Sequence, residues 1–136
     1  MKALVIDDNQ SVRTFLERVL REAGYETVGA DDGVSAQRIV LKAGAPDLVI
    51  TDVSMPRMSG QEFAHWVRTS FPAVKVLFLT GYIDQIERRS GGDLWETVGY
   101  LEKPCTVRGL LQAVSLLMFR RLDVPATGPS CARSTR

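Results

Sequence analysis

Acidic, hydroxyl and cationic side chains stand where short apolar stretches of this chain end. Asp7 and Asp8 follow the first stretch, and Asp52 follows a run of Leu, Val and Ile residues in the middle of the chain. Thr80 and Lys103 stand at the ends of two later stretches. Each residue alone has an ordinary explanation as a helix cap, a turn residue or a surface charge. The repetition of reactive groups at successive strand ends favours one shared site instead.

The charges of these side chains indicate what such a site could do. Three carboxylates and one ammonium leave two negative charges uncompensated, which one divalent cation would balance. Hard oxygen ligands suit Mg²⁺, which keeps several waters when it binds. A metal beside a free carboxylate, a lysine and a hydroxyl matches what phosphoryl transfer requires. Asp52 could then act as a nucleophile and form an aspartyl phosphate.

The hydropathy pattern predicts strands that alternate with helices. The expected strands are residues 2–6, 25–30, 47–51, 74–79 and 98–101. Apolar residues recur between them at spacings of three and four, which is typical of amphipathic helices, and only 82–97 is irregular. This alternation predicts an α/β fold, a (βα)5 three-layer sandwich in which all parallel strands end at one edge.

The composition fits one cytoplasmic domain. At 136 residues, 45% of them hydrophobic, the chain is long enough to bury a core. The apolar stretch at residues 3–6 is too short for a signal peptide, so we expect none, and no apolar run reaches the roughly 20 residues that a membrane span needs. A net charge of +1 favours neither nucleic acid nor membrane as a partner. Cys105 and Cys131 do not suggest a disulfide framework, and His65, which has no partner cluster, is expected at the surface.

Four segments resemble the receiver domain of two-component response regulators. They are Leu4-Val5-Ile6-Asp7-Asp8-Asn9, Asp47-Leu48-Val49-Ile50-Thr51-Asp52 with Met55-Pro56-Arg57-Met58-Ser59-Gly60, Leu79-Thr80-Gly81, and Tyr100-Leu101-Glu102-Lys103-Pro104. The resemblance implies a flavodoxin-like fold with a five-stranded parallel sheet of order 2-1-3-4-5. We expect the receiver domain to span residues 1–121. Residues 122–136 show no periodicity and are expected to form a disordered tail.

The resemblance also implies a role for each reactive residue. Asp52 would be the phosphoacceptor. Asp8, Asp52 and the backbone carbonyl of Ser54 would bind Mg²⁺ directly, while Asp7 would act mainly through metal-bound water. Lys103 would pair with an oxygen of the phosphoryl group.

Further residues would carry the response to phosphorylation. Thr80 resembles the switch hydroxyl that moves toward the phosphoryl group, and Tyr100 the aromatic side chain that follows it. Ser54 and Tyr82 occupy two variable positions that tune how fast the phosphoryl group is lost. Three residues would shape the loops beside the site: Pro56, Gly60 and Pro104.

These implications lead to one expected function and two alternatives. A sensor histidine kinase or a histidine phosphotransfer protein would phosphorylate Asp52, and the altered surface would bind a downstream protein, the kinase itself or a second copy in a homodimer. With no output domain in the sequence, we expect a stand-alone regulator that neither binds DNA directly nor turns over a substrate. One alternative is a C-terminal receiver fragment of a hybrid histidine kinase. The other is a Mg²⁺-dependent aspartyl-phosphate phosphatase, against which Ser54 counts, because such enzymes carry an acid at that position.

Overall fold

The computed structural model describes residues 1–53, 57–80, 98–103 and 105–119, and nine strands and helices lie within these ranges. The strands are β1 (Lys2–Ile6), β2 (Glu26–Ala30), β3 (Leu48–Asp52), β4 (Lys75–Thr80) and β5 (Val98–Glu102). The helices are α1 (Gln10–Glu22), α2 (Gly33–Ala43), α3 (Gly60–Ser70) and α5 (Val107–Phe119).

All five strands pair in parallel in one sheet of order β2-β1-β3-β4-β5. β1 and β3 are neighbours at its centre, and Ile6 lies opposite Thr51. Further along the sheet, Asp52 lies opposite Leu79 of β4, and the last residues of β4 and β5 lie opposite each other. This register brings the carboxyl ends of β1, β3, β4 and β5 to the same edge.

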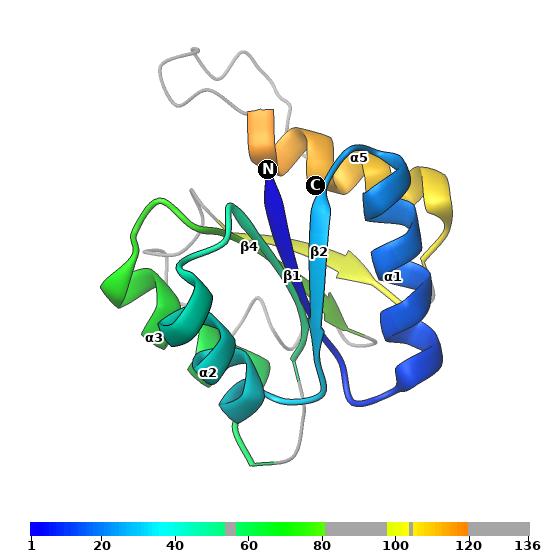
Figure 1. Cartoon of the computed structure of the whole chain (residues 1–136). Coiled ribbons are helices and arrows are strands. Elements are labelled where there is room, and N and C mark those ends of the chain that lie inside the picture. Colours follow the sequence, from blue (N-terminus) through cyan, green and yellow to red (C-terminus); the bar gives the residue numbers. More distant parts are fainter. Residues whose placement is uncertain (54–56, 81–97, 104, 120–136) are drawn as a thin grey trace.

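Helices cover both faces of the sheet, α1 and α5 on one and α2 and α3 on the other (Figure 1). Alternate residues of each central strand point to opposite faces, as the pleat of a strand requires. Leu4 and Ile6 pack with Phe63 of α3, whereas Val5 packs with Leu16 of α1. Because the central strands are apolar on both faces, the sheet is held between two cores and its ends are fixed in space.

Polar side chains fix where the helices begin. Asn9 accepts a hydrogen bond from the backbone N–H of Val12 at the start of α1. Asp32 caps α2 in the same way through the N–H of Ser35, and Ser59 forms a reciprocal capping box with Glu62 at the start of α3. Each of the caps at Asn9, Asp32 and Ser59 is the residue directly before a helix that follows a strand of the sheet. The caps therefore fix where the chain enters each helix.

The structure confirms the α/β fold class, the five parallel strands and the strand order expected from the sequence. The strand ends differ from the expected ones by a residue, since Asp52 and Thr80 are the last residues of β3 and β4 instead of the first residues beyond them. His65 is exposed as expected, and Cys105 is half-buried against the core beside α5. The predictions for 82–97 and for the tail at 122–136 lie outside the described residues.

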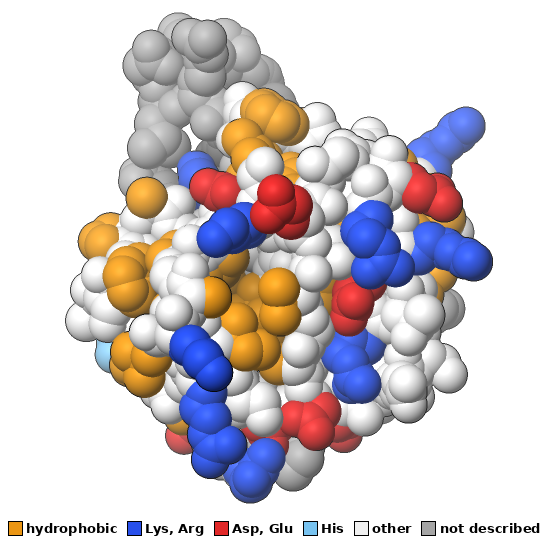
Figure 2. Space-filling view, viewed as in Figure 1, with side chains coloured by type: hydrophobic (Ala, Val, Ile, Leu, Met, Phe, Trp, Pro, Cys, Tyr) orange, Lys and Arg blue, Asp and Glu red, His pale blue; other side chains and the backbone are white. Residues whose placement is uncertain are grey.

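In the described part of the chain no helix is both long and apolar enough to span a bilayer. On the face seen in Figure 2, acidic and basic side chains are interspersed around an apolar patch. This mixture agrees with the small net charge of +1. The visible face therefore offers no large field of one sign to a charged partner.

Candidate functional site

The end of β1 presents one buried and one exposed carboxylate. Asp7 has no exposed surface, while the next residue, Asp8, is exposed. The backbone of Asp7 is anchored on two sides: its N–H donates to the carbonyl of Ala30 at 3.1 Å, and its carbonyl accepts from Nη1 of Arg13 at 2.7 Å. Its Oδ1 accepts the N–H of Asn9 at 2.9 Å. These contacts fix Asp7 and limit the movement of Asp8.

Asp52 ends β3 with its side chain half-buried and its backbone enclosed by the start of α3. The hydroxyl of Thr51 donates to the Asp52 carbonyl at 2.9 Å, and the N–H of Gly60 donates to the carbonyl of Val53 at 2.9 Å. A Cβ atom on Gly60 would lie 1.9 Å from the Asp52 carbonyl oxygen. Only glycine fits at this close approach, which gives a physical reason for the predicted importance of Gly60.

Lys103 directly follows β5, and its side chain reaches the carboxylates at the ends of β1 and β3. Its Nζ is 3.2 Å from Oδ2 of Asp7 and 3.2 Å from Oδ2 of Asp52. Partial burial disfavours the charged ammonium, but the two carboxylates outweigh burial and raise the pKa of Lys103. Lys103 is therefore a persistent cation that joins Asp7 and Asp52.

One cation does not offset the acidic charge at this edge. Burial raises the pKa of Asp7, and the nearby Asp52 carboxylate adds to this rise, against the opposing effects of the Asn9 N–H and Lys103. A buried carboxylate with a raised pKa is held in its charged form at a cost. A further positive charge would relieve that cost.

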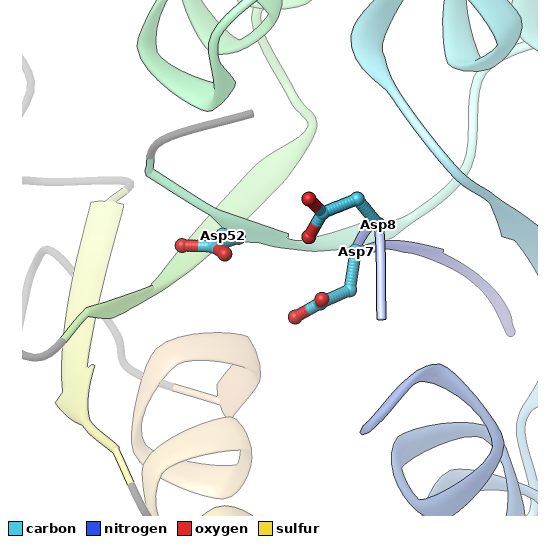
Figure 3. Close-up of side chains that lie close together, drawn as sticks. All are labelled: Asp7, Asp8 and Asp52. Carbon is cyan, nitrogen blue, oxygen red and sulfur yellow. The ribbon is translucent and has the colours of Figure 1, made fainter. Parts of the chain in front are cut away.

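The carboxylates of Asp7, Asp8 and Asp52 converge on a common space, as Figure 3 shows. One oxygen from each lies within 4.8 Å of the other two. Three hard oxygen donors with excess negative charge fit Mg²⁺ by ligand type. The site predicted from separate strand ends is thus assembled in space, and its donor set could hold a divalent cation.

The two residues expected to act as a switch lie on the neighbouring strands. Thr80 is buried at the end of β4, and its carbonyl accepts the N–H of Lys103 at 2.8 Å. Tyr100 on β5 is paired with Phe78 of β4, and their rings stack at a centroid distance of 5.4 Å. Thr80 and Tyr100 are therefore linked through the paired strands β4 and β5, and Lys103 directly follows β5.

A family model for the response regulator receiver domain matches residues 3–115 of this chain. The chain belongs to the response regulator receiver domain family.

Curated response regulators and solved receiver domains resemble this receiver over most of its length. Response regulator MprA of Mycobacterium leprae is 35% identical over 120 residues, which are 88% of this chain and 52% of that protein. This receiver thus spans about half the length of the curated relatives it matches.

Among solved structures, the chemotaxis response regulator CheY4 of Vibrio cholerae is 33% identical, with a TM-score of 0.76 over 85% of this chain and 97% of CheY4. The receiver domain of the hybrid histidine kinase CckA is 30% identical, with a TM-score of 0.71 over 87% of this chain and 99% of that one.

Several predicted residues of this receiver lie outside the described part of the chain. They are Ser54, Pro56, Tyr82 and Pro104. Their assigned roles in metal binding, in tuning the phosphoryl lifetime and in loop shape stay predictions.

The structure adds contacts of the receiver that the sequence did not reveal. Arg13 binds the Asp7 carbonyl, and Arg57 forms an ion pair with Asp32. Arg57 belongs to one of the four segments that resemble a receiver domain, but 25 positions separate it from Asp32 in the chain. Only the fold brings such a pair together. Arg13 lies in α1 only six positions after Asp7, and this short spacing could have suggested the first contact.

Proposed function

We propose that this receiver accepts a phosphoryl group on Asp52 from the phosphohistidine of a histidine kinase or histidine phosphotransfer protein. The observation that carries the proposal is the position of Lys103, whose Nζ lies 3.2 Å from Asp52 Oδ2 and 3.2 Å from Asp7 Oδ2. A carboxylate nucleophile thus has beside it both a fixed cation and two further carboxylates. Phosphoryl transfer depends on this kind of positioning and charge compensation.

In the transfer, an oxygen of Asp52 attacks phosphorus, and a P–O bond forms as the P–N bond to the donor imidazole breaks. The imidazole leaves with the bonding electrons. Lys103, kept cationic by Asp7 and Asp52, turns from the carboxylate toward the new phosphoryl oxygen. Asp8 and Asp52 would hold Mg²⁺ directly and Asp7 would act mainly through metal-bound water, and the bound ion would supply positive charge to the phosphoryl oxygens. Attack of water on the aspartyl phosphate later releases inorganic phosphate and restores the carboxylate.

The proposed response begins at the end of β4. The new negative charge attracts the hydroxyl of Thr80, and the side chain of Tyr100 follows into the space that Thr80 leaves. The stacking of Tyr100 on Phe78 supports this coupling, because a shift of β4 changes the surface on which the Tyr100 ring packs. Phosphorylation thereby biases a two-state element through a local electrostatic change.

The changed surface around β5 and α5 then gains or loses affinity for a protein partner. Receiver domains interact with histidine kinases and phosphotransfer proteins, and we place this one in the cytoplasm with such a donor. A downstream protein, the kinase itself or a second receiver are the candidate readers. The proposal treats the chain as a stoichiometric switch and not as an enzyme that turns over a substrate.

Replacing Asp52 with Asn tests the proposal. We expect acetyl phosphate with Mg²⁺ to label the wild-type receiver to about one phosphoryl group per chain, and Asp52→Asn to remain unlabelled because an amide is a far poorer nucleophile. Intact-protein mass spectrometry measures the added mass. Asp47→Asn, an exposed position directly before the start of β3, is the matched control and should label like the wild type.

Two outcomes would contradict the proposal. Normal labelling of Asp52→Asn would place the acceptor elsewhere. Steady-state release of phosphate from phosphomonoesters, without an accumulating stoichiometric adduct, would instead favour a phosphatase. The unphosphorylated receiver is then profiled against phosphorylated candidate histidine kinases, and fast transfer of the phosphoryl group to Asp52 identifies its donor.

A further inference from the structure

Arg57 has an unusual backbone conformation between β3 and α3. Its φ angle is +67°, and it is the only non-glycine residue with positive φ in the described part of the chain. A residue with a long side chain rarely adopts this conformation, and it persists where surrounding contacts hold it. The contacts of Arg57 therefore show what holds residues 57–60, at the start of α3, in place.

The side chain of Arg57 is paired with a buried carboxylate on a different element. Its Nε and Nη2 both donate to Oδ2 of Asp32, whose side chain is only 4% exposed. Asp32 is itself fixed, because its Oδ1 accepts the N–H of Ser35 at 2.8 Å at the start of α2. Burial disfavours the charged carboxylate, but Ser35 and Arg57 together lower the pKa of Asp32, so the pair stays ionised at neutral pH.

The neighbouring residue strengthens this attachment. A Cβ atom on Gly33, the first residue of α2, would lie 2.8 Å from Cβ and Cγ of Met58. Arg57 and Met58 are thus two successive residues that contact the start of α2, one through charge and one through close packing. This part of the chain is tied to an element that it does not adjoin in sequence.

At the other end of residues 57–60, Gly60 contacts the backbone of the proposed phosphoacceptor. Gly60 donates its N–H to the carbonyl of Val53 and approaches the Asp52 carbonyl so closely that no Cβ would fit. A displacement of the segment would therefore press on the backbone of Asp52 itself. Within residues 57–60, Arg57 thus pairs with Asp32, and Gly60 contacts Asp52.

We propose that the Asp32–Arg57 ion pair is a positioning device that holds residues 57–60 at the start of α3 and thereby keeps the Asp52 carboxylate aligned with Asp7 and Asp8. Arg57 and Asp32 contribute no oxygen to that carboxylate cluster, so they act on it only through position. Ordering the segment before a cation binds reduces the ordering cost of binding. The inference rests on the proposed function, since it assigns a determinant of Mg²⁺ affinity and of phosphoryl acceptance at the same site.

The test uses Arg57→Asn in the full chain, because Asn tolerates positive φ and removes the ion pair without adding backbone strain. Isothermal titration with Mg²⁺ alone should show roughly fivefold weaker binding than the wild type, in line with coupling between groups of one network. Labelling by acetyl phosphate at subsaturating Mg²⁺ should slow by a similar factor and recover at saturating Mg²⁺. Arg38→Gln, which removes an exposed arginine of α2, is the matched control and should change neither quantity.

Two further variants separate positioning from a general loss of stability. Asp32→Asn keeps a capping residue at the start of α2, and the double variant with Arg57→Asn should weaken Mg²⁺ binding no more than either single variant does. Arg57→Lys keeps the charge and should restore part of the affinity. If Arg57→Asn does not fold, the comparison of Arg57→Lys with the wild type replaces it, with a smaller loss expected.

The outcomes distinguish this inference from the proposed function. Unchanged Mg²⁺ affinity in Arg57→Asn overturns the inference while leaving the function intact. Slower labelling that saturating Mg²⁺ does not restore also overturns it, because the effect would then lie outside metal binding. A wild-type receiver that neither binds Mg²⁺ nor becomes labelled overturns the proposed function itself.

Discussion

Burial and the neighbouring groups shift the pKa of Asp7 in opposite directions. Asp7 is buried, and Nζ of Lys103 lies 3.2 Å from its carboxylate. Burial raises the pKa of Asp7, while Asp7 and Asp52 together raise the pKa of Lys103. The lysine thus bridges the two carboxylates in the metal-free protein. It is also the cation that would pair with an incoming phosphoryl group.

Lys103→Met is expected to separate these two roles. The metal-free variant should lose about 2 kcal/mol of unfolding free energy, because buried carboxylates lose a charged hydrogen-bond donor. Mg²⁺ affinity should be retained, since the variant removes a competing cation and no ligand. Labelling of Asp52 should fall at least tenfold, roughly the effect of losing one charge-stabilising group. Urea unfolding, titration calorimetry and mass spectrometry measure the three quantities.

Lys42→Met, an exposed substitution on α2, provides the control for Lys103→Met. It should leave all three measurements close to the wild type. An equal loss of Mg²⁺ binding and labelling in Lys103→Met would contradict the separate role assigned to the lysine.

At the scale of elements, the start of α3 controls the geometry of β3. The capping box of Ser59 and Glu62 fixes where α3 begins, and the first residue of the helix then meets the Asp52 carbonyl without room for a side chain. The sequence predicted a loop role for Gly60. It could not predict the close approach, because that distance depends on how α3 packs on the sheet.

Gly60→Ala should therefore destabilise the receiver by about 2 kcal/mol or more, since the added methyl group must displace the Asp52 backbone or the first residues of α3. The same displacement should weaken Mg²⁺ binding. Denaturant unfolding with and without Mg²⁺ measures both effects. Gln61→Ala, one residue along the same helix, should stay within roughly 0.5 kcal/mol of the wild type, and an equal loss there would contradict the steric explanation.

The link between α2 and the segment before α3 has a predicted pH dependence. The pKa of Asp32 in the folded protein is held below its ordinary value of 3.8 by Ser35 and Arg57, despite burial. Its contribution to stability is therefore fully present above about pH 4 and declines as the pH falls through the lowered pKa. Asp32→Asn should be less stable than the wild type at pH 7, and this difference should shrink at about pH 3.

Chemical unfolding at several pH values measures the difference between Asp32→Asn and the wild type. Arg57→Asn should show the same trend, because it breaks the same pair. A difference that grows as the pH falls would contradict the assigned direction of the pKa shift.

For the whole molecule, the site exists because strands distant in sequence end at one edge. Mg²⁺ should raise the thermal midpoint of the wild type, because a ligand that binds only the folded state stabilises it by about 2.7 kcal/mol at a hundredfold excess over the dissociation constant. Chelation with EDTA should reverse the shift, and Asp8→Asn should lose most of it. Differential scanning calorimetry checks these shifts, and an unshifted wild type would argue against the metal site.

The sequence predicted most of this architecture for a physical reason. Apolar strands buried on both faces leave an unambiguous pattern, and reactive residues at their ends meet once the crossovers are right-handed. Asp7, Asp8, Asp52 and Lys103 could be found in this way. The Asp32–Arg57 pair could not, because both residues lie in turns, where no periodicity relates one turn to another.

The position of Lys103 directly after β5 has a consequence for a chain that is still being made. Asp7 and Lys103 are 96 positions apart. At a synthesis rate of about 5–20 residues per second, Asp7 emerges roughly 5–20 s before the lysine that balances it exists. During that interval the ribosome-bound chain carries the acidic half of the site without its cation. A nascent receiver therefore cannot complete the charge balance of this carboxylate cluster until β5 has joined the sheet and brought Lys103 to it.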